Sequence, residues 1–214
     1  MKKVSALFLA AIIGVLGWVT IAGAQVNAGI SITDDGIKSF YLAIGQTYNV
    51  PEREVYAVRE RRIPDEELPV VFFIARRARV EPKTVIEFRL GNHSWFEVSR
   101  HFGLGADAFY IECREVPKGP HGKAFGYYRN RPRSEWKDIR LGDDDIVNLV
   151  NVRFVMDRYH YPAEEVFRMR ESNRNYVTVH REAEKGRNKD GEKKKVVVAE
   201  PGKEKKQGHK RHGD

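Results

Sequence analysis

Apolar side chains recur three and four positions apart along most of this chain, a spacing that predicts short amphipathic α-helices. One helix is expected from Asp34 or Asp35 to about Tyr48, a second from Glu66 to about Arg79, and a third after the acidic run at 143–145. Each starts at or just after aspartate, which suits the free amides and the positive dipole of a helix N-terminus. The pattern therefore favours helices over strands.

A group of similar residues recurs three times, at 44–59, 74–89 and 155–170. Each copy has an apolar helix end, a short turn, a proline, apolar residues three apart, and then an arginine, which is Arg59, Arg89 or Arg170. Proline is tolerated at a helix start because the first amides have no helical partner. Each copy therefore predicts a helix, a turn and a second short helix.

Another helix start follows the second and third copies, whereas the first copy is degenerate there. Ser94 opens a capping box, and Asn175 can cap the turn that follows it. Trp95 and Val98 align with Tyr176 and Val179. The residues predicted to be buried are Val85, Ile86, Phe88, Trp95 and Val98 in one lobe, and Val150, Val155, Val166, Met169 and Val179 in the other.

Residues 104–133 interrupt the helical pattern. They hold four glycines and three prolines among several aromatic residues, a composition that makes helix improbable. The segments 109–116 and 125–129 could instead pair as a β-hairpin. We therefore expect an irregular connector between two helical regions.

The predicted fold is all-α or mainly α, with short helix-turn-helix-like repeats in two lobes. The expected boundaries are a signal peptide at 1–24, a first helical lobe at 25–104, the connector at 105–133, a second helical lobe at 134–184 and a disordered basic tail at 185–214. The tail is assigned as disordered because it is highly charged and poor in apolar groups.

The N-terminus has the pattern of a secretory signal peptide. Lys2 and Lys3 precede an uncharged run, and the sequence Ala22-Gly23-Ala24 resembles a cleavage site, so cleavage is expected after Ala24. A retained inner-membrane anchor is the alternative, since about 18 apolar residues lie at the lower limit for a membrane span. In both cases the body lies outside the cytoplasm, in the periplasm or secreted.

The formal net charge of +8 is concentrated at the two ends of the chain. Residues 1–24 carry two lysines, and residues 185–214 carry 11 Lys/Arg against 5 Asp/Glu, so residues 25–184 are neutral. A neutral body argues against a fold that tracks nucleic-acid phosphates. The basic tail instead suggests contact with an anionic envelope polymer, a lipid surface or an acidic protein.

No motif for catalysis, metal binding or cofactor binding stands out. The histidines are scattered and lack metal-ligand spacing, and no serine has the context of a nucleophile elbow. Cys113 cannot form an intramolecular disulfide because it is the only cysteine, and a buried, inert thiol is the preferred interpretation. We therefore expect a protein that is not an enzyme and has no cofactor.

The connector loop is the best candidate for a binding surface, because exposed loops often carry binding residues. Its glycine spacing does not match a phosphate-binding loop. The residues predicted to form this surface are His121, Lys123, Phe125, Tyr127 and Tyr128.

The motifs Val80-x-Pro82-x2-Val85-Ile86-x-Phe88-Arg89 and Ser94-Trp95-x-Glu97-Val98 resemble those of a family of small exported bacterial helical proteins of unknown function. The resemblance covers the stretches 80–102 and 145–179, about a third of the chain. It implies a helical, exported protein and brings no catalytic residue with it.

Together these patterns predict a non-catalytic interaction or structural module of the bacterial envelope, with an unknown partner. The alternative is a helix-turn-helix-like nucleic-acid-binding protein with an uncleaved N-terminal anchor. In that case residues 94–100 would form the recognition helix. Nucleic acid is the less favoured partner because of export and the neutral body.

Overall fold

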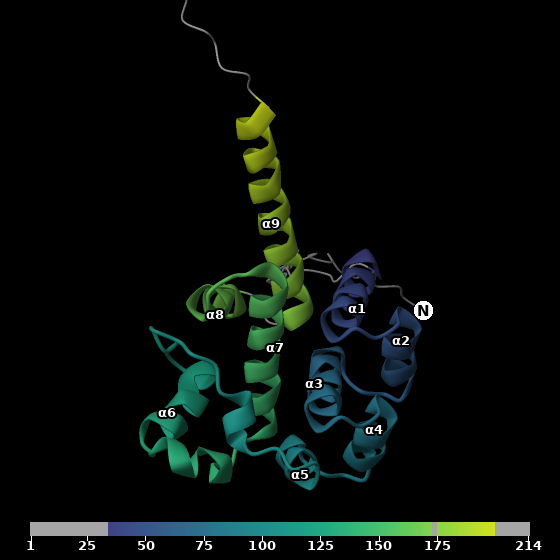
Figure 1. The fold of residues 1–214 in the computed structure, drawn as a ribbon, viewed down its shortest axis with the longest axis vertical. Helices are drawn as coiled ribbons and strands as arrows, with labels where there is room; N and C mark the ends of the chain where they lie inside the picture. The colour runs from purple at the N-terminus through teal and green to yellow at the C-terminus, as the bar shows by residue number, and fades with distance from the viewer. Residues whose placement is uncertain (1–33, 173–174, 200–214) are drawn as a thin grey trace, which may run out of the picture. The chain divides into compact units, whose positions relative to one another are not determined.

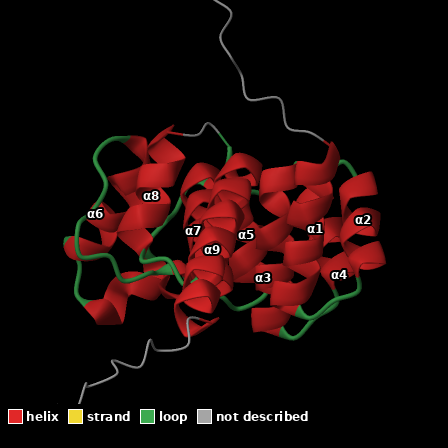
Figure 2. Ribbon diagram, turned by 90° about the horizontal axis from the view of Figure 1, so that it is seen from above, coloured by secondary structure: helices red, strands yellow, loops and turns green. Residues whose placement is uncertain are grey.

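The computed structural model describes residues 34–172 and 175–199, with side chains placed for 35–172 and 175–188. These residues belong to one compact unit. Their regular structure is entirely helical (Figure 2), which confirms the predicted fold class. The predicted signal peptide at 1–24 lies outside the described residues. None of the helices in the described ranges is both long and apolar enough to span a membrane.

Nine α-helices and four short 3₁₀ helices follow one another along the described residues (Figure 1). The α-helices are α1 (Asp34–Tyr48), α2 (Glu52–Glu60), α3 (Leu68–Ala78), α4 (Pro82–Leu90), α5 (Trp95–His101), α6 (Lys123–Arg129), α7 (Asp143–Tyr159), α8 (Ala163–Ser172) and α9 (Tyr176–Ala199). The 3₁₀ helices are η1 (Asp65–Glu67), η2 (Ala106–Phe109), η3 (Pro120–Gly122) and η4 (Arg133–Asp138).

Helices α1, α3, α7 and α9 form the centre of the fold. Helices α1 and α7 contact each other and both α3 and α9, while α2, α4 and α8 pack against this centre from outside (Figure 1). Aromatic rings fill the space inside, with Tyr48 stacked between Phe72 and Phe154 at centroid distances of 6.1 and 6.4 Å. Burial of such large rings supplies much of the stabilising free energy of a small core.

The three copies of the repeat have the same local geometry. Pro51, Pro82 and Pro162 each stand at or immediately before the start of a short outer helix. Each preceding long helix ends on a residue with left-handed backbone: φ is 58° at Asn49, 58° at Arg79 and 62° at His160. The left-handed residue reverses the chain and frees the proline to start the next helix.

The predicted core residues are buried, with one partial exception. Trp95, Val98, Val85, Ile86, Val150, Val155, Val166, Met169 and Val179 are all buried. Phe88 is only half-buried. Its ring lies between those of His93 and His101, with centroid distances of 4.1 and 4.0 Å. The residues predicted for the two lobes belong to one continuous core. Helix α7 joins the two sets, because it contacts α3 and α5 as well as α8 and α9.

The predicted β-hairpin in the connector is wrong. Residues 109–116 form no strand, and residues 123–129 form helix α6. Phe125 and Tyr128 lie three positions apart, so one face of α6 buries both side chains against the core. The glycines in this segment did not prevent a short helix because tertiary packing outweighs their weak intrinsic preference.

The C-terminal helix extends into the segment predicted to be disordered. Helix α9 continues to Ala199 and runs past the other helices (Figure 1). Its first turns are anchored in the core through Tyr176, Val179 and Ala183, which removes the cost of helix nucleation for the residues that follow. Lysine and glutamate then support the helix because both have good helix propensity. Residues 200–214 lie outside the described part of the chain.

Candidate functional site

The arginine that ends each repeat makes a specific junction with the next helix. In the second copy, the Arg89 guanidinium lies over the Trp95 ring at 4.7 Å and pairs with Asp143 at 2.9 Å. The other oxygen of Asp143 accepts the backbone N–H of Trp95 at 2.7 Å. One carboxylate therefore fixes both the arginine and the start of α5, where the first amides lack helical partners.

The third copy builds the same junction at the start of α9. Arg170 lies over the Tyr176 ring at 4.6 Å and its guanidinium is 3.8 Å from Glu66. Glu66 accepts the backbone N–H of Tyr176 at 2.6 Å. In the first copy, Arg59 pairs with Asp65 at 2.6 Å, and Asp65 stands at the position of the aromatic residue. The degenerate copy thus keeps the ion pair and loses the ring.

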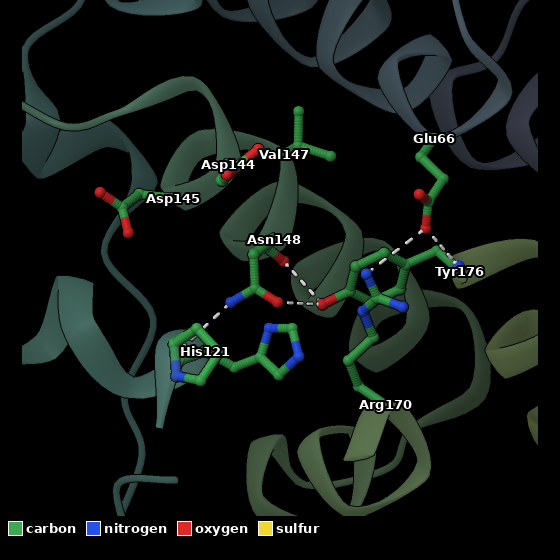
Figure 3. Close-up of a pocket in the computed structure, with 9 residues that line it drawn as sticks. Glu66, His121, Asp144, Asp145, Val147, Asn148, Arg170 and Tyr176 are labelled. Atoms are coloured by element: carbon green, nitrogen blue, oxygen red, sulfur yellow. Dashed lines mark hydrogen bonds and ion pairs between the residues drawn. The ribbon is translucent and has the colours of Figure 1, made fainter. Parts of the chain in front are cut away.

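A pocket of about 280 Å³ opens beside the Arg170–Tyr176 junction (Figure 3). It lies between the first turns of α7, the η3 turn and the start of α9. Its lining residues are Glu66, Pro120, His121, Asp144, Asp145, Val147, Asn148, Arg170 and Tyr176. Its volume is close to the lower limit of ordinary small-molecule sites.

Most of the polar groups around the pocket are already used by the fold. The Tyr176 hydroxyl donates to the Asn148 side-chain oxygen, and the Asn148 amide donates to the His121 backbone carbonyl at 3.3 Å (Figure 3). Asp145 accepts the backbone N–H of Gly142 at 3.0 Å and so caps α7. These bonds fix the pocket wall in one arrangement.

The His121 imidazole and the Asp144 carboxylate are the polar groups best placed to meet a ligand. The His121 ring faces the cavity (Figure 3). Burial, and secondarily the charge of Arg170, lowers the pKa of His121 below its usual value, so the imidazole is neutral at pH 7. A neutral imidazole can donate one hydrogen bond and accept another.

Only part of the predicted binding surface lies at this pocket. His121 lines it, Lys123 is exposed, and Tyr127 is half-buried. Phe125 and Tyr128 are core residues, 5% and 2% exposed, so their side chains are not available as a surface. Phe125 packs edge-on against Phe167 at 5.7 Å, and the Tyr128 hydroxyl donates to a backbone carbonyl. Their helical spacing buries them, whereas a loop would have exposed them.

The carboxylates and the amide of the pocket were not predicted as site residues. Glu66 and Asn148 come from elements 82 positions apart in the chain, and no local motif joins them. The acidic run at 143–145 was interpreted as a helix start, which is correct: α7 begins at Asp143. The sequence feature that could have indicated these carboxylates is the repeated arginine, because a buried arginine requires a carboxylate or carbonyl partner.

A second polar cluster joins α1, α7 and α9. His180 is fully buried, with Nδ1 2.8 Å from the Tyr159 hydroxyl and Nε2 3.2 Å from the Ser39 hydroxyl. Ser39 donates to Glu184 at 2.8 Å. Since the Ser39 proton goes to Glu184, Nε2 must donate to Ser39 and Nδ1 must accept from Tyr159. One neutral tautomer of His180 satisfies the whole chain of bonds.

Cys113 is half-buried, rather than fully buried as expected. Its thiol lies 3.0 Å from the backbone carbonyl of Glu115. Burial, followed by the nearby Glu164 carboxylate, raises the pKa of the Cys113 thiol to about 11. A thiol with such a pKa is a poor nucleophile at neutral pH. Among the described residues, no group of three or more histidine, cysteine or acidic side chains is arranged to hold a metal ion.

The chain was compared with protein-family models, curated proteins and solved structures. No family model matches it, and no curated protein or solved structure matches it either.

Proposed function

We propose that this protein is a non-catalytic binding module of the bacterial envelope, and that it binds its ligand in the pocket beside Arg170 and Tyr176. The proposal is based on one observation: some polar side chains of the pocket wall hold helices in place, and others do not. Glu66, Asn148 and Asp145 hold helices in place. The His121 ring and Asp144 also line the cavity, and their side chains make no hydrogen bond to the described residues. A rigid wall with a few open polar groups is typical of a binding site.

The charge of the wall favours a ligand that carries an ammonium group. Three carboxylates, those of Glu66, Asp144 and Asp145, line the pocket together with one guanidinium, that of Arg170. Because Arg170 pairs with Glu66, the uncompensated charge comes from Asp144 and Asp145. A primary ammonium can pair with these carboxylates, and ring hydroxyls of the same ligand can bond to the His121 imidazole.

Calorimetric titration with two related sugars tests this proposal. Glucosamine carries an ammonium, and N-acetylglucosamine has the same ring without that charge. We expect saturable binding of glucosamine that is at least tenfold tighter than that of N-acetylglucosamine. Asp144→Asn should remove the preference, whereas Asp138→Asn, a change at an exposed residue paired with Arg100, should preserve it. Equal binding of both sugars, or no effect of Asp144→Asn, would contradict the proposal.

Export is part of the same proposal and rests on the N-terminal sequence pattern. Protein recovered from the envelope fraction of a bacterial host should begin at Gln25. Amino-terminal sequencing provides the measurement, and recovery of the full chain from the cytosol would exclude export.

The basic tail supports a contact with an anionic envelope polymer or lipid, because residues 185–214 have a net charge of +6. Such a contact weakens as salt screens the charges. Co-sedimentation with anionic vesicles at low and high salt should distinguish the mature chain from one that ends at Glu184. Equal salt-sensitive binding by both chains would place the contact on the body instead.

A further inference from the structure

A second cavity, of about 440 Å³, lies where the four central helices meet. Gln46 and Thr47 of α1, Arg76 of α3, Asp157 and Arg158 of α7, and Arg187 of α9 line it. His160, which follows α7, completes the wall. We propose that this cavity is a binding site for a phosphate-bearing ligand, separate from the pocket at His121.

The first argument is charge. Three arginines share the cavity wall with a single carboxylate, that of Asp157. Within the described side chains, none of Arg76, Arg158 and Arg187 has a carboxylate oxygen within 4.0 Å, although the other arginines of the core junctions do. Like charges that share a wall with too few counter-charges are unfavourable unless an anion joins them. The wall therefore has a net positive charge that a phosphate can neutralise.

Capping of helix C-termini explains only part of the clustering of arginines at this cavity. Helices α1, α3 and α7 all end here, and their C-terminal carbonyls attract cations. Arg76 donates to the Thr47 carbonyl at 3.2 Å, and Arg187 donates to the Arg158 carbonyl at 2.8 Å. Each of these bonds uses one of the five N–H groups that an arginine carries. Capping thus positions the guanidinium groups and leaves most of their donors for a ligand.

The second argument is that the guanidinium groups are held in position before a ligand binds. Arg158 donates to the Gln46 side-chain oxygen, while Arg76 and Arg187 are held by backbone carbonyls. The Nε of Arg158 is buried, so the terminal N–H groups of its guanidinium are the donors that a phosphate can reach. Donors fixed in advance lose little conformational entropy when a ligand binds.

Arginine is well suited to this ligand, because its planar fork matches the oxygens of a phosphate group in two parallel hydrogen bonds. The cavity is larger than a single phosphate ion needs, so a phosphate ester fits the volume better. Either a soluble phosphate ester or the headgroup of a phospholipid could supply this group. The same recognition chemistry serves both sources.

Titration of the full-length protein at physiological salt tests the site and distinguishes the two sources. The soluble probes are inorganic phosphate and glycerol 3-phosphate. The lipid probes are vesicles of phosphatidylcholine with and without phosphatidic acid. Binding of glycerol 3-phosphate would indicate a soluble ligand, and binding of phosphatidic acid vesicles alone would indicate a headgroup. Absence of saturable binding to all of these probes would overturn the proposal.

The variants link binding to the cavity. Arg76→Gln and Arg158→Gln should each weaken binding at least tenfold, whereas Arg53→Gln, which changes an exposed arginine of α2, should leave it unchanged. Helical circular dichroism of each variant verifies folding. Binding that persists in both Arg76→Gln and Arg158→Gln, or that is lost equally in Arg53→Gln, would assign the contact to general surface charge and overturn the proposal.

Discussion

The guanidinium carbon of Arg89 lies 4.7 Å from the centre of the Trp95 ring. Arg170 and Tyr176 have the same relationship, at 4.6 Å, in another copy of the repeat. In both cases an acidic residue from elsewhere in the fold accepts the backbone N–H of the aromatic residue and pairs with the arginine. These two copies of the repeat therefore share a contact between an arginine, an aromatic residue and a carboxylate, in addition to their helical pattern.

Replacement of Arg89 should be costly because it breaks several contacts at once. Arg89→Ala leaves Asp143 and Glu67 without their cation, and we expect a loss of about 2–3 kcal/mol in the free energy of unfolding. Arg100→Ala, which removes an exposed pair with Asp138, should cost less than about 1 kcal/mol. Urea denaturation measures both. Equal losses for the two variants would show that the junction adds nothing beyond surface charge.

Trp95 should be the most sensitive of the core positions predicted for the first lobe. It is fully buried, so Trp95→Ala should reduce stability by about 3–5 kcal/mol. Trp95→Phe should cost less, because the buried indole N–H makes no hydrogen bond to the described residues. Leu90→Ala, at a residue 52% exposed, is the control and should change stability by less than about 0.5 kcal/mol. Thermal unfolding that is unaffected by Trp95→Ala would exclude a core role.

Stability should depend on pH through His180. Burial lowers the pKa of His180 to about 4, whereas an unfolded histidine titrates near 6.5. The unfolded chain therefore binds the proton first, and the contribution of this group is fully present above pH 6.5 and is lost as the pH falls towards 4. The loss is about 3 kcal/mol over this interval.

A comparison with His180→Gln isolates this effect from the carboxylates, which titrate in the same range. The unfolding free energy of the parent protein should fall more steeply between pH 6.5 and 4 than that of the variant. Parallel profiles would mean that His180 has the same pKa in the folded and unfolded chains.

The Cys113 thiol should react slowly with alkylating reagents. With its pKa raised to about 11, the thiolate fraction at pH 8 is about 100-fold smaller than that of an ordinary thiol. Glu164→Gln removes the second cause of the shift and should accelerate the reaction. The measurement is the rate of iodoacetamide labelling followed by mass spectrometry. Labelling as fast as that of free cysteine would contradict the raised pKa.

Local sequence determined the helices and the repeat. Proline, apolar spacing and aspartate act within one or two helical turns, so the starts of α1, α4 and α7 could be predicted from neighbouring residues alone. The burial of Trp95 and Val179 followed in the same way, because helical spacing places them on the face that packs inward.

Tertiary structure decided the rest. Helix α6 forms in a glycine-rich segment because Phe125 and Tyr128 pack into the core. The helix propensities of its residues do not predict this packing. Both cavities bring together residues from distant parts of the chain, such as Glu66 with Tyr176 and Gln46 with Arg187. Periodicity shows which face of a helix is buried, but the partner of that face depends on the packing of the whole chain, and so do the polar groups that meet at a site.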